Sequence, residues 1–312
     1  MKEYINSQHR YYSLDYYLKN KYKSKVFKVA LNGNFTCPNR DGKISHQGCI
    51  FCSPSGSGDF AGNKKDTLEI QFKTVSSIIH QKWQDAFYIV YFQANTNTYK
   101  PLNELQEMFE KAIKLDPKII AISIATRPDC LPDDVLEYLN DLNKRIPVWL
   151  ELGLQTSNDN TAKFINRGYD LDVFIDCVKR IRKYNIETIV HIINGLPFET
   201  ENDMYETVRF LNSLDIQGIK IHSLFVLENT PLAKVYQEEN FKMLTLEEYV
   251  KITAEQLAIL RDDIVIHRIN GDAPKDLLIA PLWSIKKLVV MNEIDKYMRN
   301  NQLYQGKYYK NN

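Results

Sequence analysis

The sequence of 312 residues predicts an α/β fold, a partial (β/α)6 TIM-like barrel with small N- and C-terminal additions. Short β-branched runs alternate with longer amphipathic stretches, which is typical of parallel strands joined by right-handed helical crossovers. Polar residues cluster directly after the strands, as in barrels whose loops at the carboxyl ends of the strands build the active site. We therefore expect six strand–helix units to curl around one site.

The expected core strands are short apolar runs at residues 27–31, 88–92, 119–124, 148–154, 188–193 and 219–224. The helical patterns between and after them cover residues 75–83, 102–115, 133–143, 171–184, 201–214 and 246–260. We divide the chain into three parts. They are an N-terminal basic and aromatic extension (1–26), the barrel core (27–262) and a C-terminal α/β tail (263–312), which has one more strand at 264–267 and one helix.

Composition predicts a cytoplasmic protein. The N-terminus lacks the apolar core of a signal peptide, and no stretch reaches the roughly 20 apolar residues of a membrane span. The 40 basic and 39 acidic residues nearly cancel, which neither favours nor excludes a nucleic-acid partner.

Three of the five cysteines lie close together, at Cys37, Cys49 and Cys52. In a reducing compartment such a group favours metal or cluster ligation over disulfides. Soft thiolates select zinc or iron–sulfur, and structural zinc normally has four ligands, so a zinc knuckle would need His46 as the fourth. Three cysteines instead suit a [4Fe-4S] cluster with one iron left open. Both hypotheses stand at this point, and the cluster is favoured because the cysteines follow the first strand.

Several further segments carry a resemblance to a known family. They are Cys37-Pro-Asn-Arg-Asp-Gly, Gly48-Cys-Ile-Phe-Cys, Ser57-Gly-Asp-Phe-Ala-Gly, Tyr91-Phe-Gln-Ala-Asn-Thr-Asn-Thr-Tyr, Thr126-Arg-Pro-Asp-Cys, Glu151-Leu-Gly-Leu-Gln-Thr, Asn166-Arg-Gly and His191-Ile-Ile-Asn-Gly-Leu-Pro. Together they resemble the Elp3-like branch of the radical S-adenosylmethionine (SAM) superfamily over residues 27–230. Within that branch the chain resembles the bacterial MnmL (YtqA) group of tRNA wobble-uridine-modifying enzymes. The resemblance implies a [4Fe-4S] cluster held by the three cysteines and SAM bound at its open iron.

The resemblance also implies which residues contact SAM. The SAM amino group would contact Gln93, Asn95 and Thr96 in the segment after the second strand, and the SAM carboxylate would contact Arg167. The ribose would contact Gln155 and His191, and the adenine would contact Phe51 and Gly195. Glu151 is expected to point into the barrel, as a ribose ligand or as an ion-pair partner.

Structural alternatives exist for several of these residues. Arg167 could end a helix, His191 could be a core histidine and Gln155 could anchor a loop. The chain also departs from the family pattern, with Ala125 where the Elp3 motif has an acidic residue and Ala94-Asn95 where related enzymes have glycines.

Other residues have weaker functional expectations. Cys130 and His222 follow the third and sixth strands and are weak catalytic candidates, whereas Cys177 fits a helix core. Residues 10–25 and 306–310 mix cations with tyrosines, which could contact RNA phosphates and bases or could simply cover a barrel end.

The resemblance implies an enzyme that converts 5-carboxymethylaminomethyl-(2-thio)uridine-34 of tRNA to 5-aminomethyl-(2-thio)uridine-34. Its partners would be tRNA and an electron donor such as flavodoxin or ferredoxin, with no membrane. One alternative is a radical SAM enzyme that acts on another RNA site or on a small molecule. A second is a non-catalytic RNA-binding module stabilised by zinc or a cluster.

Overall fold

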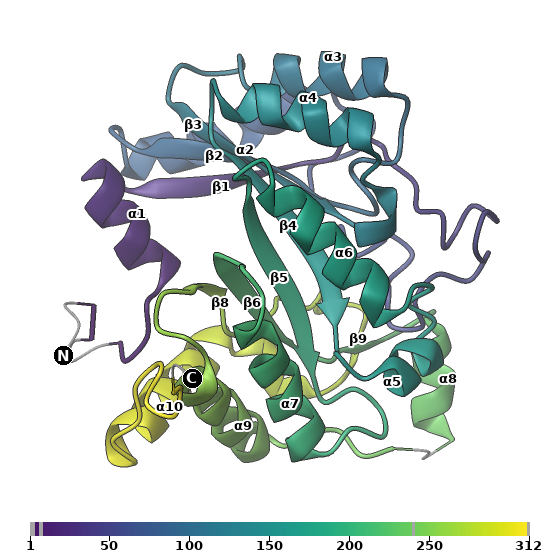
Figure 1. The fold of residues 1–312 in the computed structure, drawn as a ribbon, viewed down its shortest axis with the longest axis vertical. Helices are drawn as coiled ribbons and strands as arrows, with labels where there is room; N and C mark the ends of the chain where they lie inside the picture. The colour runs from purple at the N-terminus through teal and green to yellow at the C-terminus, as the bar shows by residue number, and fades with distance from the viewer. Residues whose placement is uncertain (1–3, 6–8, 239–240, 311–312) are drawn as a thin grey trace.

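A computed structural model describes residues 4–5, 9–238 and 241–310 of the chain, and its centre is a curled, wholly parallel seven-stranded sheet (Figure 1). The strand order is β1-β2-β3-β4-β5-β6-β8, so each strand lies beside the next along the sequence. The strands are β1 (Val26–Leu31), β2 (Phe87–Phe92), β3 (Ile119–Thr126), β4 (Val148–Gln155), β5 (Glu187–Asn194), β6 (Gly218–Ser223) and β8 (Val265–Arg268). The predicted α/β partial barrel is confirmed.

Helices cover the outer face of the sheet (Figure 1). They are α2 (Leu68–Lys82), α3 (Leu102–Ala112), α4 (Asp133–Asn143), α6 (Leu171–Arg182), α7 (Glu201–Asn212) and α9 (Leu246–Ile259). Thr200 and Thr245 begin α7 and α9 with reciprocal capping boxes, which satisfy the free N–H groups of the first turn. Apolar side chains such as Leu105 and Phe109 of α3 are fully buried against the strands.

The structure adds elements that sequence patterning did not predict. β8 pairs in parallel with β6, so the strand expected in the C-terminal tail is the seventh strand of the barrel sheet. A two-stranded antiparallel sheet, β7 (Val226–Leu227) with β9 (Leu278–Ala280), joins the core to the tail. Short helices α5 (Asp159–Phe164) and α8 (Pro231–Gln237) were also missed, and α10 (Lys287–Asn300) is the tail helix.

The N-terminal segment covers the amino ends of the strands. Helix α1 (Leu14–Tyr22) inserts Leu18 against Trp149 and Ile189, near the starts of β4 and β5. Figure 1 shows α1 at this end, while the loop between β1 and α2 lies at the opposite, carboxyl end. This packing supports the barrel-cover interpretation of residues 10–25. RNA contact by their exposed cations stays a prediction.

The C-terminal segment holds this cover in place through Gln305, whose surface is 1% exposed. Its side-chain oxygen accepts a hydrogen bond from the backbone N–H of Tyr12 at 2.8 Å, and its amide donates to the carbonyls of Arg261 and Ile264. The backbone N–H of Gln305 also donates to the carbonyl of Arg10. One buried amide thus joins the two ends of the described chain.

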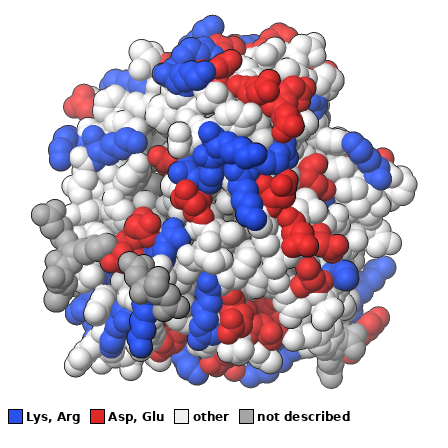
Figure 2. Space-filling view, viewed as in Figure 1, with Lys and Arg blue, Asp and Glu red and all other residues white. Residues whose placement is uncertain are grey.

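Charges on the face that shows α6 and α7 are mixed (Figure 2). The basic last turn of α6 includes Arg180 and Arg182, which form ion pairs with Asp133 and Asp215. Such surface pairs mainly balance local charge and add little stability. No helix in residues 4–5, 9–238 or 241–310 is both long and apolar enough to cross a membrane.

Replacing Leu18 by Ala should destabilise the protein by about 2–4 kcal/mol, because the cavity left between α1 and the strand starts cannot collapse. Urea unfolding followed by circular dichroism measures this change. Asn20→Ala, on the exposed side of the same helix, is the matched control and should change stability by less than about 0.5 kcal/mol. Equal effects of the two substitutions would contradict the docking of α1.

Candidate active site

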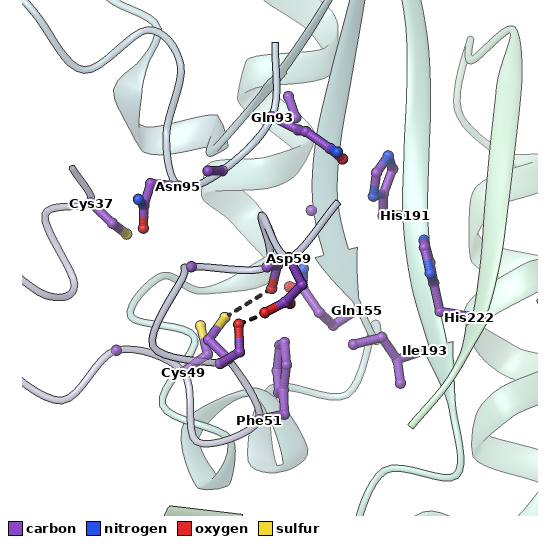
Figure 3. A pocket seen from close by; sticks show the side chains of 18 of the residues that line it. Cys37, Cys49, Phe51, Asp59, Gln93, Asn95, Gln155, His191, Ile193 and His222 are labelled. Atoms are coloured by element: carbon purple, nitrogen blue, oxygen red, sulfur yellow. Dashed lines mark hydrogen bonds between the residues drawn. The ribbon is translucent and has the colours of Figure 1, made fainter. Parts of the chain in front are cut away.

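A cavity of about 310 Å³ opens at the carboxyl ends of the strands. One wall is the long loop between β1 and α2, which holds the three clustered cysteines, and the other is formed by the strand ends. Figure 3 shows Cys37, Cys49 and Phe51 on the loop side, facing His191 and His222 on neighbouring strands. The volume lies within the range of ordinary small-ligand pockets.

Backbone hydrogen bonds hold the cysteine loop against the rest of the barrel rim. Ile50, between Cys49 and the cavity-lining Phe51, donates its N–H to the carbonyl of Ile165 and accepts from the N–H of Leu232, both at 3.0 Å. The side-chain amide of Asn39 points at the Cys49 sulfur at 3.7 Å and donates to the carbonyl of Asn166 at 2.6 Å. The loop is therefore anchored by α5, by α8 and by the turn after α5.

The thiols fit a soft metal cluster chemically. The hydrogen bond between Cys49 and Cys52 lowers the pKa of Cys52 to about 7 and raises that of Cys49. Arg40 and Arg127 also favour the Cys52 thiolate, which is the form that binds metal. Together with Cys37, which lines the same cavity, these side chains supply three thiolates beside an open space.

The zinc alternative lacks its fourth ligand in this geometry. His46 is exposed and packs beside Gly42, and it is not among the residues that line the cavity. Within the described part of the chain, no three His, Cys, Asp or Glu side chains, the three cysteines included, are grouped closely enough to hold a single metal ion.

The segment after β2 keeps the backbone of a glycine-rich turn without its glycines. Ala94 and Asn95 have φ angles of 80° and 59°, both in the left-handed region that glycine favours. A Cβ atom on Gly58 would lie 2.3 Å from the Ala94 Cβ, so this turn and the cysteine loop are in close contact. Thr96, which is 1% exposed, lines the cavity, and its hydroxyl has no hydrogen-bond partner among the described residues. This orphaned hydroxyl fits the predicted site for the SAM amino group.

Arg167 is buried, and its guanidinium is hydrogen-bonded to other residues of the same chain. It donates to the carbonyls of Leu154, Thr156 and Tyr169 and to a carboxylate oxygen of Asp159, at 2.8–3.0 Å. Arg167 lines the cavity, yet these contacts show that it also holds the loop after β4. Its contact with the SAM carboxylate stays a prediction.

Gln155 and His191 reach the cavity from neighbouring strands. Gln155 has a φ of 63° at a bulge in the β4–β5 pairing, and the Tyr169 hydroxyl donates to its side-chain oxygen at 3.4 Å. The His191 ring contacts Glu151 through Nε2 at 2.7 Å. Burial, together with the nearby Lys220, lowers the pKa of His191 to about 4, so the ring is neutral.

Glu151 is an ion-pair partner in this structure. Its side chain is 0% exposed, and its Oε1 accepts from the Lys28 ammonium and the Ser123 hydroxyl, both at 2.6 Å. Its Oε2 accepts from the Lys220 ammonium and contacts His191. Burial opposes ionisation, but Lys220 and Lys28 outweigh it and hold the pKa of Glu151 well below its ordinary value.

The remaining predicted site residues are divided between the cavity and other places. Gln93 and His222 line the cavity, whereas Gly195 does not, and Ile193 on the same chain segment does instead. Gly195 has a φ of 86° and packs against Leu244. Cys130 is buried in a second cavity on the other side of the cysteine loop, where burial raises its thiol pKa to about 12.

Comparisons with known proteins place the chain in a family. The profile of the radical SAM superfamily matches residues 41–211, and that of the radical SAM C-terminal domain matches residues 216–300. The chain is 48% identical over 306 residues to the Bacillus subtilis protein YtqA, covering 98% of this chain and 95% of that protein. The chain belongs to the radical SAM superfamily. The alternative hypothesis of a non-catalytic RNA-binding module is therefore excluded, because the radical SAM domain identifies this protein as an enzyme.

More distant similarity is found to a tRNA uridine(34) acetyltransferase and to an Elp3 structure. A tRNA uridine(34) acetyltransferase of Methanocaldococcus infernus is 23% identical over 212 residues, covering 67% of this chain and 38% of that protein. The archaeal Elp3 structure from the same organism has a TM-score of 0.67 at 16% identity, covering 90% of this chain and 64% of that one. The radical SAM enzyme described here thus shares the fold of a longer Elp3 protein and corresponds to only part of it.

Three charged residues near the site were missed from the sequence: Lys28, Lys220 and Arg268. Lys28 interrupts an otherwise apolar strand, and Lys220 lies between two isoleucines of β6; these interruptions were the available signal. Arg268 ends the strand that had been placed in the tail. The radical SAM family implies SAM and a [4Fe-4S] cluster, and the three cysteines are the residues that would hold the cluster.

Replacing Cys37, Cys49 or Cys52 by Ala should abolish iron binding, because each removal leaves the cluster with two thiolates. Anaerobic reconstitution followed by iron and sulfide analysis should find about four of each per wild-type chain. Cys177→Ala is the control, since Cys177 is 1% exposed in the helical core, and it should bind iron normally. Stoichiometric zinc in place of iron after reconstitution would contradict the cluster assignment.

A half-buried carboxyl group, that of Glu199, predicts a pH effect on stability. Burial raises the pKa of Glu199 from 4.5 to about 7, and its carboxylate accepts a hydrogen bond from Thr156. The folded state therefore binds a proton more tightly than the unfolded state does, and this stabilisation is lost as pH rises from about 4.5 through 7.

Glu199→Gln should thus gain stability relative to wild type as pH rises, by roughly 1–3 kcal/mol at pH 8 and little at pH 5. Urea unfolding at both pH values measures the difference. Glu137→Gln, at an exposed position of α4, should show no such pH-dependent gain. A constant difference between wild type and Glu199→Gln across this range would show that Glu199 ionises normally.

Proposed function

We propose that this radical SAM enzyme modifies tRNA by converting the 5-carboxymethylaminomethyl group of uridine-34, with or without a 2-thio group, to 5-aminomethyl. The proposal follows the resemblance to the MnmL (YtqA) group. The similarity to a protein named tRNA uridine(34) acetyltransferase supports the same nucleoside as the target. A cytoplasmic location and an electron donor such as flavodoxin or ferredoxin belong to the same proposal.

The observation that carries the proposal is the arrangement of three thiols on one wall of a cavity whose opposite wall is polar and cationic. The bound cluster would supply the electron that cleaves SAM, so that a carbon-bound hydrogen of the substrate arm is abstracted. The orphaned Thr96 hydroxyl and the Gln155 amide would position SAM along the strand ends. The substrate arm would then occupy the part of the cavity lined by β6 and β8.

A uridine must leave the base stack to place its arm in such a cavity. Phe60 lies on the cysteine loop, lines the cavity and leaves 56% of its surface exposed. Aromatic side chains at the mouth of a site stack on unpaired bases of single-stranded RNA loops. Phe60 therefore supports entry of an anticodon base from the side of the cysteine loop.

Deleting the gene should cause 5-carboxymethylaminomethyluridine to accumulate in tRNA and should remove nucleosides derived from 5-aminomethyluridine. Mass spectrometry of digested tRNA measures both. Purified enzyme with SAM and a reductant should convert the accumulated tRNA, while the Cys49→Ala protein should not. Complementation of the deletion strain by Cys177→Ala is the matched control and should restore the wild-type profile.

An unchanged wobble-uridine profile in the deletion strain, together with no conversion by purified enzyme, would contradict this proposal. If the enzyme still cleaves SAM, it acts on another RNA site or on a small molecule.

A further inference from the structure

The inner end of the cavity has two carboxylates, each paired with two cations. Glu151 contacts Lys28 and Lys220, and Asp272 contacts Arg268 and Lys287. Lys220 and Arg268 line the cavity from β6 and β8, together with both carboxylates and His222. Lys28 approaches from β1 and forms an ion pair with the same Glu151. Buried charges are normally paired, so an excess of one sign in a cavity requires an explanation.

Glu151 does not neutralise this end of the cavity. Each of its oxygens already has two polar partners, and the two ammonium groups of Lys28 and Lys220 share its single negative charge. Besides Glu151, the one hydrogen bond of Lys220 to another described residue is a 3.4 Å contact with the Tyr91 hydroxyl. Burial, together with Lys28 and Arg268, lowers the pKa of Lys220 to about 7. A carboxylate bound beside Lys220 would favour its charged form, because an opposite charge nearby stabilises the ammonium.

The same shortage of negative charge recurs at β8. Asp272 contacts the guanidinium of Arg268 at 3.2 Å and the ammonium of Lys287 at 2.9 Å. The single carboxylate of Asp272 is thus shared by two cations. The Arg268 side chain leaves 34% of its surface exposed. The unpaired part of its guanidinium is thus accessible from the cavity that it lines.

His222 lies two residues beyond Lys220 on β6, and Lys220 is paired with Arg268 in the β6–β8 register. Its Nε2 atom is buried and has no hydrogen-bond partner among the described residues. Burial and the neighbouring His191, Arg268 and Lys220 keep its pKa well below the usual value, so the ring is neutral. Figure 3 shows His222 on the strand side of the cavity, away from Cys37. In the tautomer that carries its proton on Nε2, this neutral imidazole donates a hydrogen bond to an anion beside Lys220 and Arg268.

We propose that Lys220, His222 and Arg268 form a carboxylate-binding subsite that receives the carboxylate of the substrate arm. This inference rests on the proposed function, in which the carboxymethyl group is the part removed. The subsite would hold the far end of the arm on β6 and β8. The carbons of the arm would then lie between this subsite and the thiol-lined wall.

The test uses two synthetic anticodon stem-loops of identical sequence. One carries 5-carboxymethylaminomethyluridine at position 34, and the other carries its methyl ester, which keeps the arm but removes the negative charge. Their affinities for reconstituted holoenzyme with SAM are measured anaerobically without reductant, so that no turnover occurs. Wild type should bind the carboxylate at least about tenfold more tightly than the ester, as expected for charge-assisted hydrogen bonds.

Arg268→Gln should lower this affinity ratio severalfold, since Lys220 and His222 remain, while Arg268→Lys should keep more of it. Lys286→Gln is the control, because Lys286 is an exposed cation of the same C-terminal segment, and it should leave the ratio unchanged. SAM affinity of Arg268→Gln should equal that of wild type, which separates the substrate carboxylate from the SAM carboxylate. Arg268→Gln also leaves the Glu151 network intact, so misfolding is not expected, and circular dichroism checks this.

A wild-type ratio near one, an unchanged ratio in Arg268→Gln, or a loss of SAM affinity in that variant would each overturn the subsite. Turnover distinguishes this failure from failure of the proposed function. Conversion of the carboxylate stem-loop without charge discrimination would refute the subsite alone. Discrimination without conversion would support the subsite and refute the proposed reaction.

Discussion

A fully buried carboxylate, that of Glu151, is the constraint around which the barrel is organised. A charge without water is tolerated only when its lone pairs are satisfied, and here the partners come from four other strands of the sheet. Lys28 on β1 and Lys220 on β6 lie on opposite sides of β4 in the sheet order, and the curl of the sheet brings both to one carboxylate. These ion pairs therefore join strands that are not neighbours in the sheet.

This arrangement divides the cavity into two chemical halves. The rim carries thiols, serines and the close-packed turn at Ala94 and Asn95, all suited to holding a cofactor at the mouth. The interior carries ammonium, guanidinium and neutral imidazole groups, which are suited to a negatively charged ligand. Because the histidines stay uncharged, they offer hydrogen bonds without adding to the repulsion between the lysines.

Much of the fold was predictable, because strands buried on both faces appear in a sequence as apolar runs and the crossover helices as amphipathic ones. The site was only partly predictable. The cysteine spacing is local and was recognised, whereas the partners of Glu151 are 123 and 69 residues away, at Lys28 and Lys220. Only the curvature of the sheet brings them together. Arg167 shows the same limit, since its hydrogen bonds depend on the path of the loop after β4.

The hydrogen bonds of Gln305 also couple two distant segments of the described chain. The amide that holds Tyr12 also donates to the carbonyls of Arg261 and Ile264, which lie just before β8. A disturbance of this one side chain would therefore loosen the N-terminal segment and the start of the seventh strand together. Proteolysis near either segment is expected to expose the other, because a single buried amide holds both.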